Sequence, residues 1–301
     1  MQVLRNCWYM FAWADELGPD ASLTRTIAGE PVTVRRSGDT LASESAAGRD
    51  IAVEPRYRII WIWLGDAADA DPSLIPDFSC FDRVKDTAFS WGILPTAANY
   101  ELLADNILDL SHADFLHPTT LGGGAMTRST PKIERDGVSL IVTWDAPNDT
   151  ALPVFDRLLP KPGQPAHVRI AVRWHPAAAM MLRAQVAPAG EPLEDWFDVH
   201  AAHVMTPADQ FNTHYFFGSS RNYRTDDAEF HAAQSRMILA AFEHEDKPIV
   251  EAQQRAMGEA EFFSLKPVLL PIDAGPVQAR RMLAQLIAKE AAARPPLLNI
   301  V

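Results

Sequence analysis

Alternating and β-branched segments fill residues 131–223 and constrain the fold more than any other feature. They read "PKIERDGVSLIVTWDA" (131–146), "HVRIAVRWH" (167–175), "AMMLRAQVAP" (179–188), "WFDVHAAHVMTP" (196–207) and "FNTHYFFGSSRNY" (211–223). The first holds Asp136-Gly137 between two apolar runs, which is typical of a tight β-hairpin. The later segments follow at hairpin-like spacing. The pattern therefore predicts one antiparallel sheet.

The last third of the chain has helical sequence. Residues 226–260 form a long stretch of helix-forming residues that is interrupted before Pro248, and residues 276–293 form another. Ahead of the strands, residues 99–116 carry leucine and isoleucine at helical spacing. Strands followed by long helices predict an α+β fold in which a curved antiparallel sheet packs over long helices.

Two further strands are expected near the N-terminus. They lie at residues 30–36 and 57–66, where β-branched and aromatic residues gather between Gly and Asp. A proline-punctuated connection at residues 69–78 separates them from the rest of the chain. We therefore expect two domains, residues 1–75 and residues 76–301.

Charge and cysteine content argue against several classes of protein. The net charge of −12 disfavours a nucleic-acid partner, because a phosphate backbone attracts clustered Lys and Arg. The two cysteines, Cys7 and Cys80, are far apart and form no Cys-x-x-Cys, and the N-terminus lacks a signal-peptide pattern. The longest apolar run, which begins at Ile59, is too short to span a bilayer. We expect a cytoplasmic protein that binds neither nucleic acid nor membrane.

The segment "NILDLSHADFLH" (106–117) combines two histidines with acids and leucines. On a regular helix His112 and His117 would lie roughly 140° apart, so both can face one ion only if the helix ends or bends between them. Pro118 favours such an end, because it disfavours the helical conformation at His117. The histidines are candidate ligands of a divalent metal such as non-haem iron(II), which would need a third, carboxylate ligand.

Spacing alone leaves two alternatives open. The histidines can instead stabilise a helix C-terminus through its dipole, with no metal involved. The third ligand can be any of several acids, each of which can equally be a solvated charge: Glu243, Glu245, Asp246 and Asp198. Asp114 is expected to be a surface charge.

Residues 105–117 closely resemble the iron-binding segment of Rieske-type non-haem iron ring-hydroxylating oxygenases. The shared pattern is Asn, two residues, Asp, two residues, His, four residues, His. Within that family the chain resembles the oxygenase components of vanillate and dicamba O-demethylases, through "RNCWYMFAWADEL", "IIWIWLGD", "HYFFGSSRNY" and "EDKPIVEAQQ" in the same order. The resemblance implies a truncated N-terminal Rieske-like β domain followed by a helix-grip, START-like catalytic domain.

The resemblance also implies roles for individual residues. His112, His117 and Asp246 would bind mononuclear iron(II). Asp109 would hydrogen-bond His112 and link the iron site to the electron donor of a neighbouring subunit. Asn106 would lie near the iron without necessarily binding it.

An activity follows from the same resemblance. The chain would be a terminal oxygenase that uses O2 and electrons from an NAD(P)H-linked ferredoxin or flavin reductase. It would hydroxylate the methyl group of a methoxy-aromatic acid, vanillate-like, and so release formaldehyde by O-demethylation. His175, His203 and Arg236 are the expected substrate contacts, and a homotrimer is the expected assembly.

The ligands of the family's 2Fe–2S cluster are missing from the chain. Relatives hold the cluster with Cys-x-His and Cys-x-x-His pairs, whereas no histidine follows Cys7 or Cys80 at either spacing. Only the polar segment 43–55 stands where the cluster loops would fall, and it has little to bury.

Three explanations for the missing ligands are open: a segment skipped in the sequence, a chain shortened by trimming, or a natural loss of the cluster. We favour the skipped segment, because "LASES" joins its neighbours without evident turn chemistry. A cluster-less chain would also suit a second class of function. It would be a catalytically inactive small-molecule binding protein on the same fold.

Overall fold

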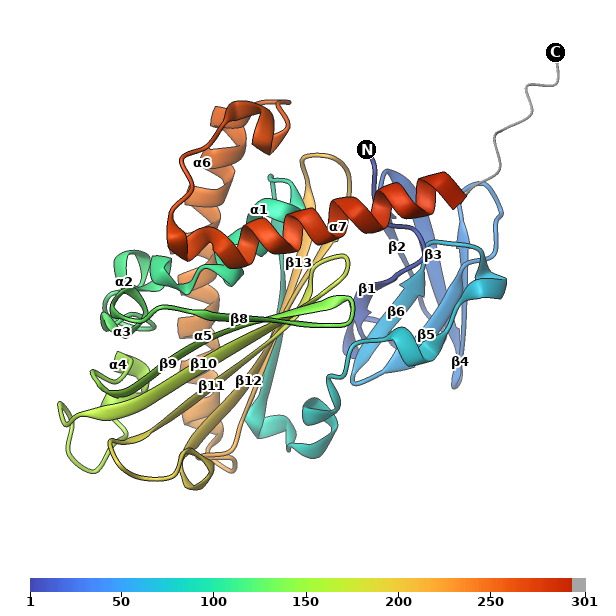
Figure 1. The fold of residues 1–301 in the computed structure, drawn as a ribbon. Coiled ribbons are helices and arrows are strands. Elements are labelled where there is room, and N and C mark those ends of the chain that lie inside the picture. Colours follow the sequence, from blue (N-terminus) through green and yellow to red (C-terminus); the bar gives the residue numbers. More distant parts are fainter. Residues whose placement is uncertain (294–301) are drawn as a thin grey trace, which may run out of the picture.

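The computed structural model describes residues 1–293, whose largest element is a seven-stranded antiparallel sheet (Figure 1). Its strands follow the spatial order β7-β13-β12-β11-β10-β9-β8. Their bounds are β7 (Phe89–Thr96), β8 (Lys132–Asp136), β9 (Ser139–Asp149), β10 (Ala166–His175), β11 (Ala179–Pro188), β12 (Phe197–Pro207) and β13 (Thr213–Arg221). The predicted antiparallel sheet is confirmed, and β7 joins it from ahead of the first helix.

The register of the sheet follows from the alternation in the sequence. Along β10 the residues Val168, Ile170, Val172 and Trp174 are buried, while those between them are partly exposed. A shift of one residue would move this whole apolar row to the opposite face, so the pattern fixes the pairing. The β8–β9 hairpin turns at Gly137 as predicted, with the positive φ of +60° that favours glycine.

Helices pack against this sheet and against each other. They are α1 (Tyr100–Leu108), α5 (Ala228–Ala241), α6 (Lys247–Met257) and α7 (Ala274–Ala293). In Figure 1, α5 runs behind the sheet, and α7 crosses above it toward the N-terminal strands. Arg280 links α7 to α1 by forming ion pairs with Asp105 and Glu101 of α1, at 2.7 and 3.1 Å. The α+β fold is confirmed.

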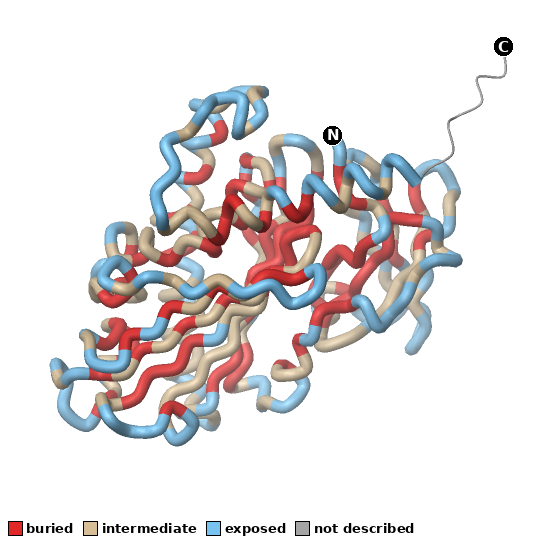
Figure 2. The backbone as a smooth tube through the Cα atoms, viewed as in Figure 1, coloured by how far each residue is buried: buried red, intermediate tan, exposed pale blue. Residues whose placement is uncertain are grey.

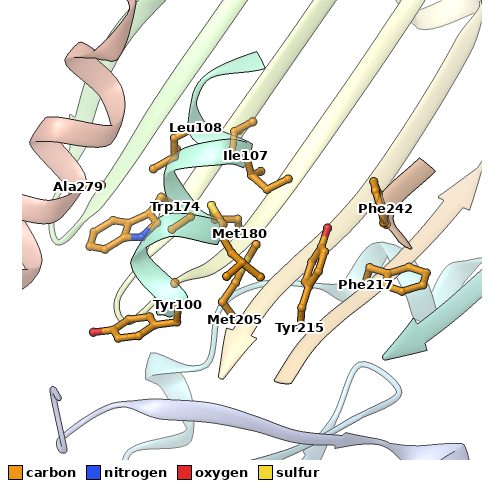
Figure 3. Packing of buried hydrophobic residues seen from close by; sticks show 14 of the residues in the cluster. Tyr100, Ile107, Leu108, Trp174, Met180, Met205, Tyr215, Phe217, Phe242 and Ala279 are labelled. Atoms are coloured by element: carbon orange, nitrogen blue, oxygen red, sulfur yellow. The ribbon is translucent and has the colours of Figure 1, made fainter. Parts of the chain in front are cut away.

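The apolar core lies between α1 and the sheet. Figure 3 shows Ile107 and Leu108 of α1 gathered with Trp174 of β10 and Met180 of β11. Figure 2 shows the buried residues following the strands and the underside of the helices, while the hairpin loops are exposed. Burial on this face holds α1, and therefore the segment that follows it, in a fixed position over the sheet.

Two small sheets form the N-terminal part. One has the order β1-β6-β5 and the other the order β2-β3-β4. Their bounds are β1 (Trp8–Trp13), β2 (Ser22–Ile27), β3 (Glu30–Ser37), β4 (Thr40–Ser45), β5 (Ala52–Arg56) and β6 (Ile59–Trp63). The strands predicted at residues 30–36 and 57–66 are confirmed as β3 and β6.

The segment 43–55 was expected to be a polar connection without turn chemistry, and that expectation is wrong. It contains the end of β4 and nearly all of β5, joined by a tight turn in which Gly48 has φ +73°. The backbone N–H of Gly48 donates to the carbonyl of Ser45, and Arg49 N–H donates to the Ser45 hydroxyl at 3.2 Å. The connection therefore gives no structural reason to infer a skipped segment.

Three short helices fill the connections around the sheet: α2 (Ala113–Leu116), α3 (Ala125–Arg128) and α4 (Pro153–Asp156). The interruption predicted before Pro248 is a π-helical segment, Phe242–Asp246, that joins α5 to α6 without a break in the helix. π-Helical turns of this kind are often found at functional sites. Within residues 1–293 no helix has both the length and the apolar character needed to cross a membrane.

Candidate metal centre

Two departures from regular helix bring His112 and His117 together. The first is at Asp109, whose φ of −119° and ψ of 87° end α1 and start a short 3-10 turn, Leu110–His112. The second is at His117, which lies just beyond α2 with φ −121° and ψ 42°. The rings stand 5.5 Å apart at 78°. The end of the helix at His117 follows the prediction from Pro118, whereas the break at Asp109 was not predicted.

Asp246, at the end of the π-helical segment, faces both histidines. Its carboxylate lies 3.1 Å from Nε2 of His117 and 3.5 Å from Nε2 of His112. The three ligand atoms all lie within 4.8 Å of one another, and no other group of three or more such side chains occurs within residues 1–293. Two imidazoles and one carboxylate form the ligand set that non-haem iron(II) oxygenases use, so the residues fit a divalent metal.

Both histidines have their second ring nitrogen fixed by an acceptor. Nδ1 of His112 donates to the backbone carbonyl of Asp109 at 2.6 Å, and Nδ1 of His117 donates to Oε2 of Glu245 at 2.5 Å. A hydrogen on Nδ1 leaves the lone pair on Nε2, which is the atom turned toward Asp246. Such partners orient metal-binding imidazoles and raise their basicity.

The electrostatics around His117 favour a cation. Burial opposes protonation of this imidazole, but its hydrogen bonds to Asp246 and Glu245 raise its pKa above the ordinary value. The ring thus lies between two carboxylates, one on each nitrogen. The same negative environment would stabilise a metal ion on Nε2.

Sequence reasoning considered Glu245 only as a possible metal ligand and missed its contact with His117, and replacing Glu245 tests that role. A Glu245→Gln variant keeps an acceptor for His117 but removes the charge, so we expect cobalt(II) affinity to fall by about tenfold, as for other partners of metal-bound histidine. Equilibrium titration followed by visible absorbance measures the affinity. Glu243→Gln is the matched control, because Glu243 is exposed in the same π-helical segment. Equal affinities in the two variants would contradict this role.

Asn106 and Asp109 both lie beside the ligand set. Nδ2 of Asn106 donates to Oδ1 of Asp246 at 3.3 Å. The side chain of Asp109 was expected to hydrogen-bond His112, but its Oδ1 accepts from the backbone N–H of Ser111 at 3.0 Å instead. The main chain of Asp109 makes the contact with His112, so a substitution that changes only its carboxylate leaves that contact in place.

An apolar cavity opens directly on the candidate ligands. It contains about 1030 Å³ of unfilled space, mouth included, and His112, His117 and Asp246 are among the residues that line it. Its walls come from α1, β10–β13 and α5, and Figure 3 shows Phe217 and Phe242 of this wall beside Tyr215. An apolar cavity with a few polar groups in its wall is typical of small-molecule sites.

The structure separates the three expected substrate contacts. His203 lines the cavity and is buried, with Nδ1 2.7 Å from the hydroxyl of Tyr215. His175 lies at the far end of β10, where Ser139 contacts its Nδ1 at 2.8 Å, and Arg236 is exposed on α5. Neither is among the residues that line the cavity. Their contact with a substrate therefore stays a prediction, because the structure places both outside the cavity wall.

Asp114 was expected to be a surface charge, and the structure gives it a structural role. Its carboxylate accepts hydrogen bonds from the backbone N–H groups of Gly124 and Thr127, at 2.7 and 2.8 Å, and from the Thr127 hydroxyl. These bonds hold the glycine-rich loop against α2. The run of glycines was the sequence signal, because such a loop needs an acceptor for its backbone N–H groups.

Comparison with known proteins identifies relatives over nearly the whole chain. Residues 96–289 match the family described as vanillate O-demethylase oxygenase C-terminal domain. The chain is 33% identical over 249 residues to the oxygenase component of dicamba O-demethylase from Stenotrophomonas maltophilia. The matched region covers 81% of this chain and 72% of that relative. It is 30% identical to the oxygenase component of chloroacetanilide N-alkylformylase from Rhizorhabdus wittichii, over 95% of this chain and 96% of the relative.

A solved structure gives the same result. Dicamba monooxygenase with non-heme iron and dicamba superposes with a TM-score of 0.79, at 28% identity, over 97% of this chain and 99% of that one. The chain belongs to the vanillate O-demethylase oxygenase family, a branch of the Rieske-type oxygenases. It is an oxygenase component and therefore an oxidoreductase, as the sequence predicted.

Proposed function

We propose that the protein oxidises an alkyl carbon of an aromatic substrate at an iron(II) ion bound by His112, His117 and Asp246. One observation carries the proposal: two imidazoles and one carboxylate converge at the wall of an apolar cavity. Iron(II) held there would supply the binding and reduction of dioxygen. Family membership supports the same reaction, since its named members include vanillate and dicamba O-demethylases.

The proposed reaction is O-demethylation of an aryl methyl ether. The ether, O2, two electrons and two protons yield a hydroxymethyl ether and water. The hydroxymethyl ether then breaks its carbon–oxygen bond to give a phenol and formaldehyde. One oxygen atom enters the substrate, the other leaves as water, and the two electrons come from a separate electron-donor protein.

The protein's own residues would position the reactants and exclude water. The apolar walls from α1, α5 and the sheet surround the substrate, and Asn106 holds the carboxylate of Asp246 by its hydrogen bond. His203 offers a polar contact in an otherwise apolar wall. A fixed geometry of this kind raises the rate, because the reacting carbon is held close to the site of oxygen activation.

We further propose that residues 1–75 and 76–301 are two domains and that the chain forms a homotrimer. Asp109 and His112 line a groove together with residues 267–269. Within this segment Val268 is 89% exposed and Leu269 is 43% exposed, which is unusual for large apolar side chains. A neighbouring subunit packed on this surface, beside Asp109, would bury them.

A further part of the proposal concerns whether the chain holds a 2Fe–2S cluster of its own to pass electrons to the iron. The described residues offer one group of three or more metal-binding side chains, the one at His112. Burial raises the pKa of the Cys7 thiol to about 12 and that of Cys80 to about 11, so both stay protonated at neutral pH. We propose that the chain holds no 2Fe–2S cluster. A measured mass of 33.3 kDa would exclude a skipped segment.

The same observation favours a second candidate function, that of a small-molecule binding protein with a vestigial metal site. Iron content separates the two candidates. The oxygenase is expected to retain about one iron per chain after anaerobic purification and to release formaldehyde from 3-methoxybenzamide when hydrogen peroxide is added. Peroxide is dioxygen already reduced by two electrons, so the test needs no cluster. An iron-free protein that releases no formaldehyde after iron loading would support the binding protein.

A further inference from the structure

We propose that the cavity beside the metal centre selects uncharged aromatic substrates, such as aryl ethers that bear an amide or ketone, over arene carboxylates. The inference rests on the proposed function, because it names the substrate class of the same site. It replaces the vanillate-like acid expected from the sequence. Three features of the cavity carry it: the absence of a cationic side chain, the balance of charge at the metal centre and the type of polar group in the wall.

The cavity has no cationic anchor. No lysine or arginine is among the described residues that line it, and its one acid is the candidate ligand Asp246. Most of the wall is hydrocarbon, with Leu182, Ile238 and Phe217 as examples. A carboxylate moved from water into such surroundings loses hydration without gaining an ion pair, which disfavours its binding. An amide or ether of the same shape avoids most of that cost.

A bound metal would not supply the missing positive charge. A divalent ion on His112, His117 and Asp246 carries two positive charges, and the carboxylate of Asp246 offsets one of them. Glu245, in contact with His117 at 2.5 Å, offsets the other. The centre with its two carboxylates is therefore neutral overall and offers no net attraction to an anion at the distance of a ring substituent.

His203 offers one neutral donor to the cavity. Tyr215 is buried, and the one hydrogen bond of its hydroxyl within the described chain is the contact with Nδ1 of His203. Burial keeps Tyr215 protonated, with its pKa well above the usual value, and lowers the pKa of His203 to about 4. Neutral Nδ1 therefore accepts from the tyrosine, which leaves the hydrogen on Nε2.

An Nε2–H donor matches a carbonyl or ether oxygen. A carboxylate has about four acceptor positions and needs several donors when it is buried. The other polar side chains of the wall are the hydroxyls of Ser90 and Ser219 and the amide of Gln234. Ser90 and Ser219 lie opposite each other on the neighbouring strands β7 and β13. All of them are neutral. The wall can therefore orient an uncharged oxygen but cannot balance an anion.

The test compares two ligands of nearly equal shape, 3-methoxybenzamide and 3-methoxybenzoate. We expect cobalt(II)-loaded protein to bind the amide at least tenfold more tightly at pH 7.5, measured by calorimetry. Gln234→Arg places a cation in the wall and is expected to bring the two affinities within about threefold, whereas Gln234→Met adds no charge and should keep the preference. Equal binding of both ligands by the unmodified protein would overturn the inference.

A second variant tests the inference independently, in case Gln234→Arg fails to fold. His203→Phe keeps the ring but removes the Nε2–H, so affinity for the amide should fall by about tenfold, the loss of one buried hydrogen bond. An unchanged amide affinity would count against the donor assigned to His203. Binding is measured without turnover, so a failure of the proposed reaction appears separately, as no formaldehyde from either ligand with iron and peroxide.

Discussion

An Asp246→Ala variant is expected to lose its divalent metal and, with it, all formaldehyde release. Among the described residues Asp246 is the one carboxylate in contact with both histidines, at 3.1 and 3.5 Å, and it is buried together with His117. Without it, two neutral imidazoles remain, and the charge that balances a metal in this buried place is halved. We expect cobalt(II) affinity to fall at least 100-fold and iron content after anaerobic loading to fall below about one tenth per chain.

The matched control for this variant is Glu243→Ala. Glu243 lies in the same π-helical segment but is exposed, so the same loss of a carboxylate there should leave metal affinity within about twofold. Circular dichroism establishes that both variants keep the helix. If Asp246→Ala retained one iron per chain and released formaldehyde, the ligand set proposed here would be incorrect. Loss of metal in both variants would instead indicate that the segment, not the ligand, had been disturbed.

The sequence was informative where a single periodicity determines the structure. The strands from β8 to β13 follow one another at hairpin-like spacing, so their antiparallel pairing could be predicted, and Asp136-Gly137 located the first hairpin. The segment 43–55 was harder, because β4 and β5 are short and partly exposed and pair at the edge of small sheets. Each of these strands contains at most one buried residue, so local composition gives little indication of a strand.

The candidate site was predictable in its ligands but not in their supports. The pattern around His112 and His117 indicated a metal, and resemblance selected Asp246. A regular helix would turn adjacent residues about 100° apart, so it gave no reason to expect Glu245 and Asp246 on the same histidine. The π-helical segment changes that spacing, and its position depends on the packing of α5 and α6. The sequence could not show that His175 and Arg236 lie outside the cavity wall, because a strand end and a helix face acquire their direction only from tertiary structure.

We expect this chain to oxidise its substrate with peroxide but not with electrons from a flavin reductase alone. With iron(II) and 3-methoxybenzamide, hydrogen peroxide should give formaldehyde, while NADH and a flavin reductase alone should give at least 100-fold less. Peroxide brings its own two electrons, since ether and peroxide yield phenol, formaldehyde and water. A reductase needs a relay to the iron, and neither Cys7 nor Cys80 is followed by the histidines that a 2Fe–2S cluster requires.

An Asp109→Asn variant tests whether electrons from a donor protein reach the metal through the Asp109 carboxylate. Its carboxylate lies in the groove beside His112, while its carbonyl holds the Nδ1 of that ring, and asparagine preserves the carbonyl and an acceptor for Ser111. The variant should therefore match the unmodified protein in iron content and in the peroxide reaction. When a Rieske ferredoxin is supplied as donor, its formaldehyde yield should fall at least tenfold. Full donor-driven yield would show that electrons reach the metal without the Asp109 carboxylate.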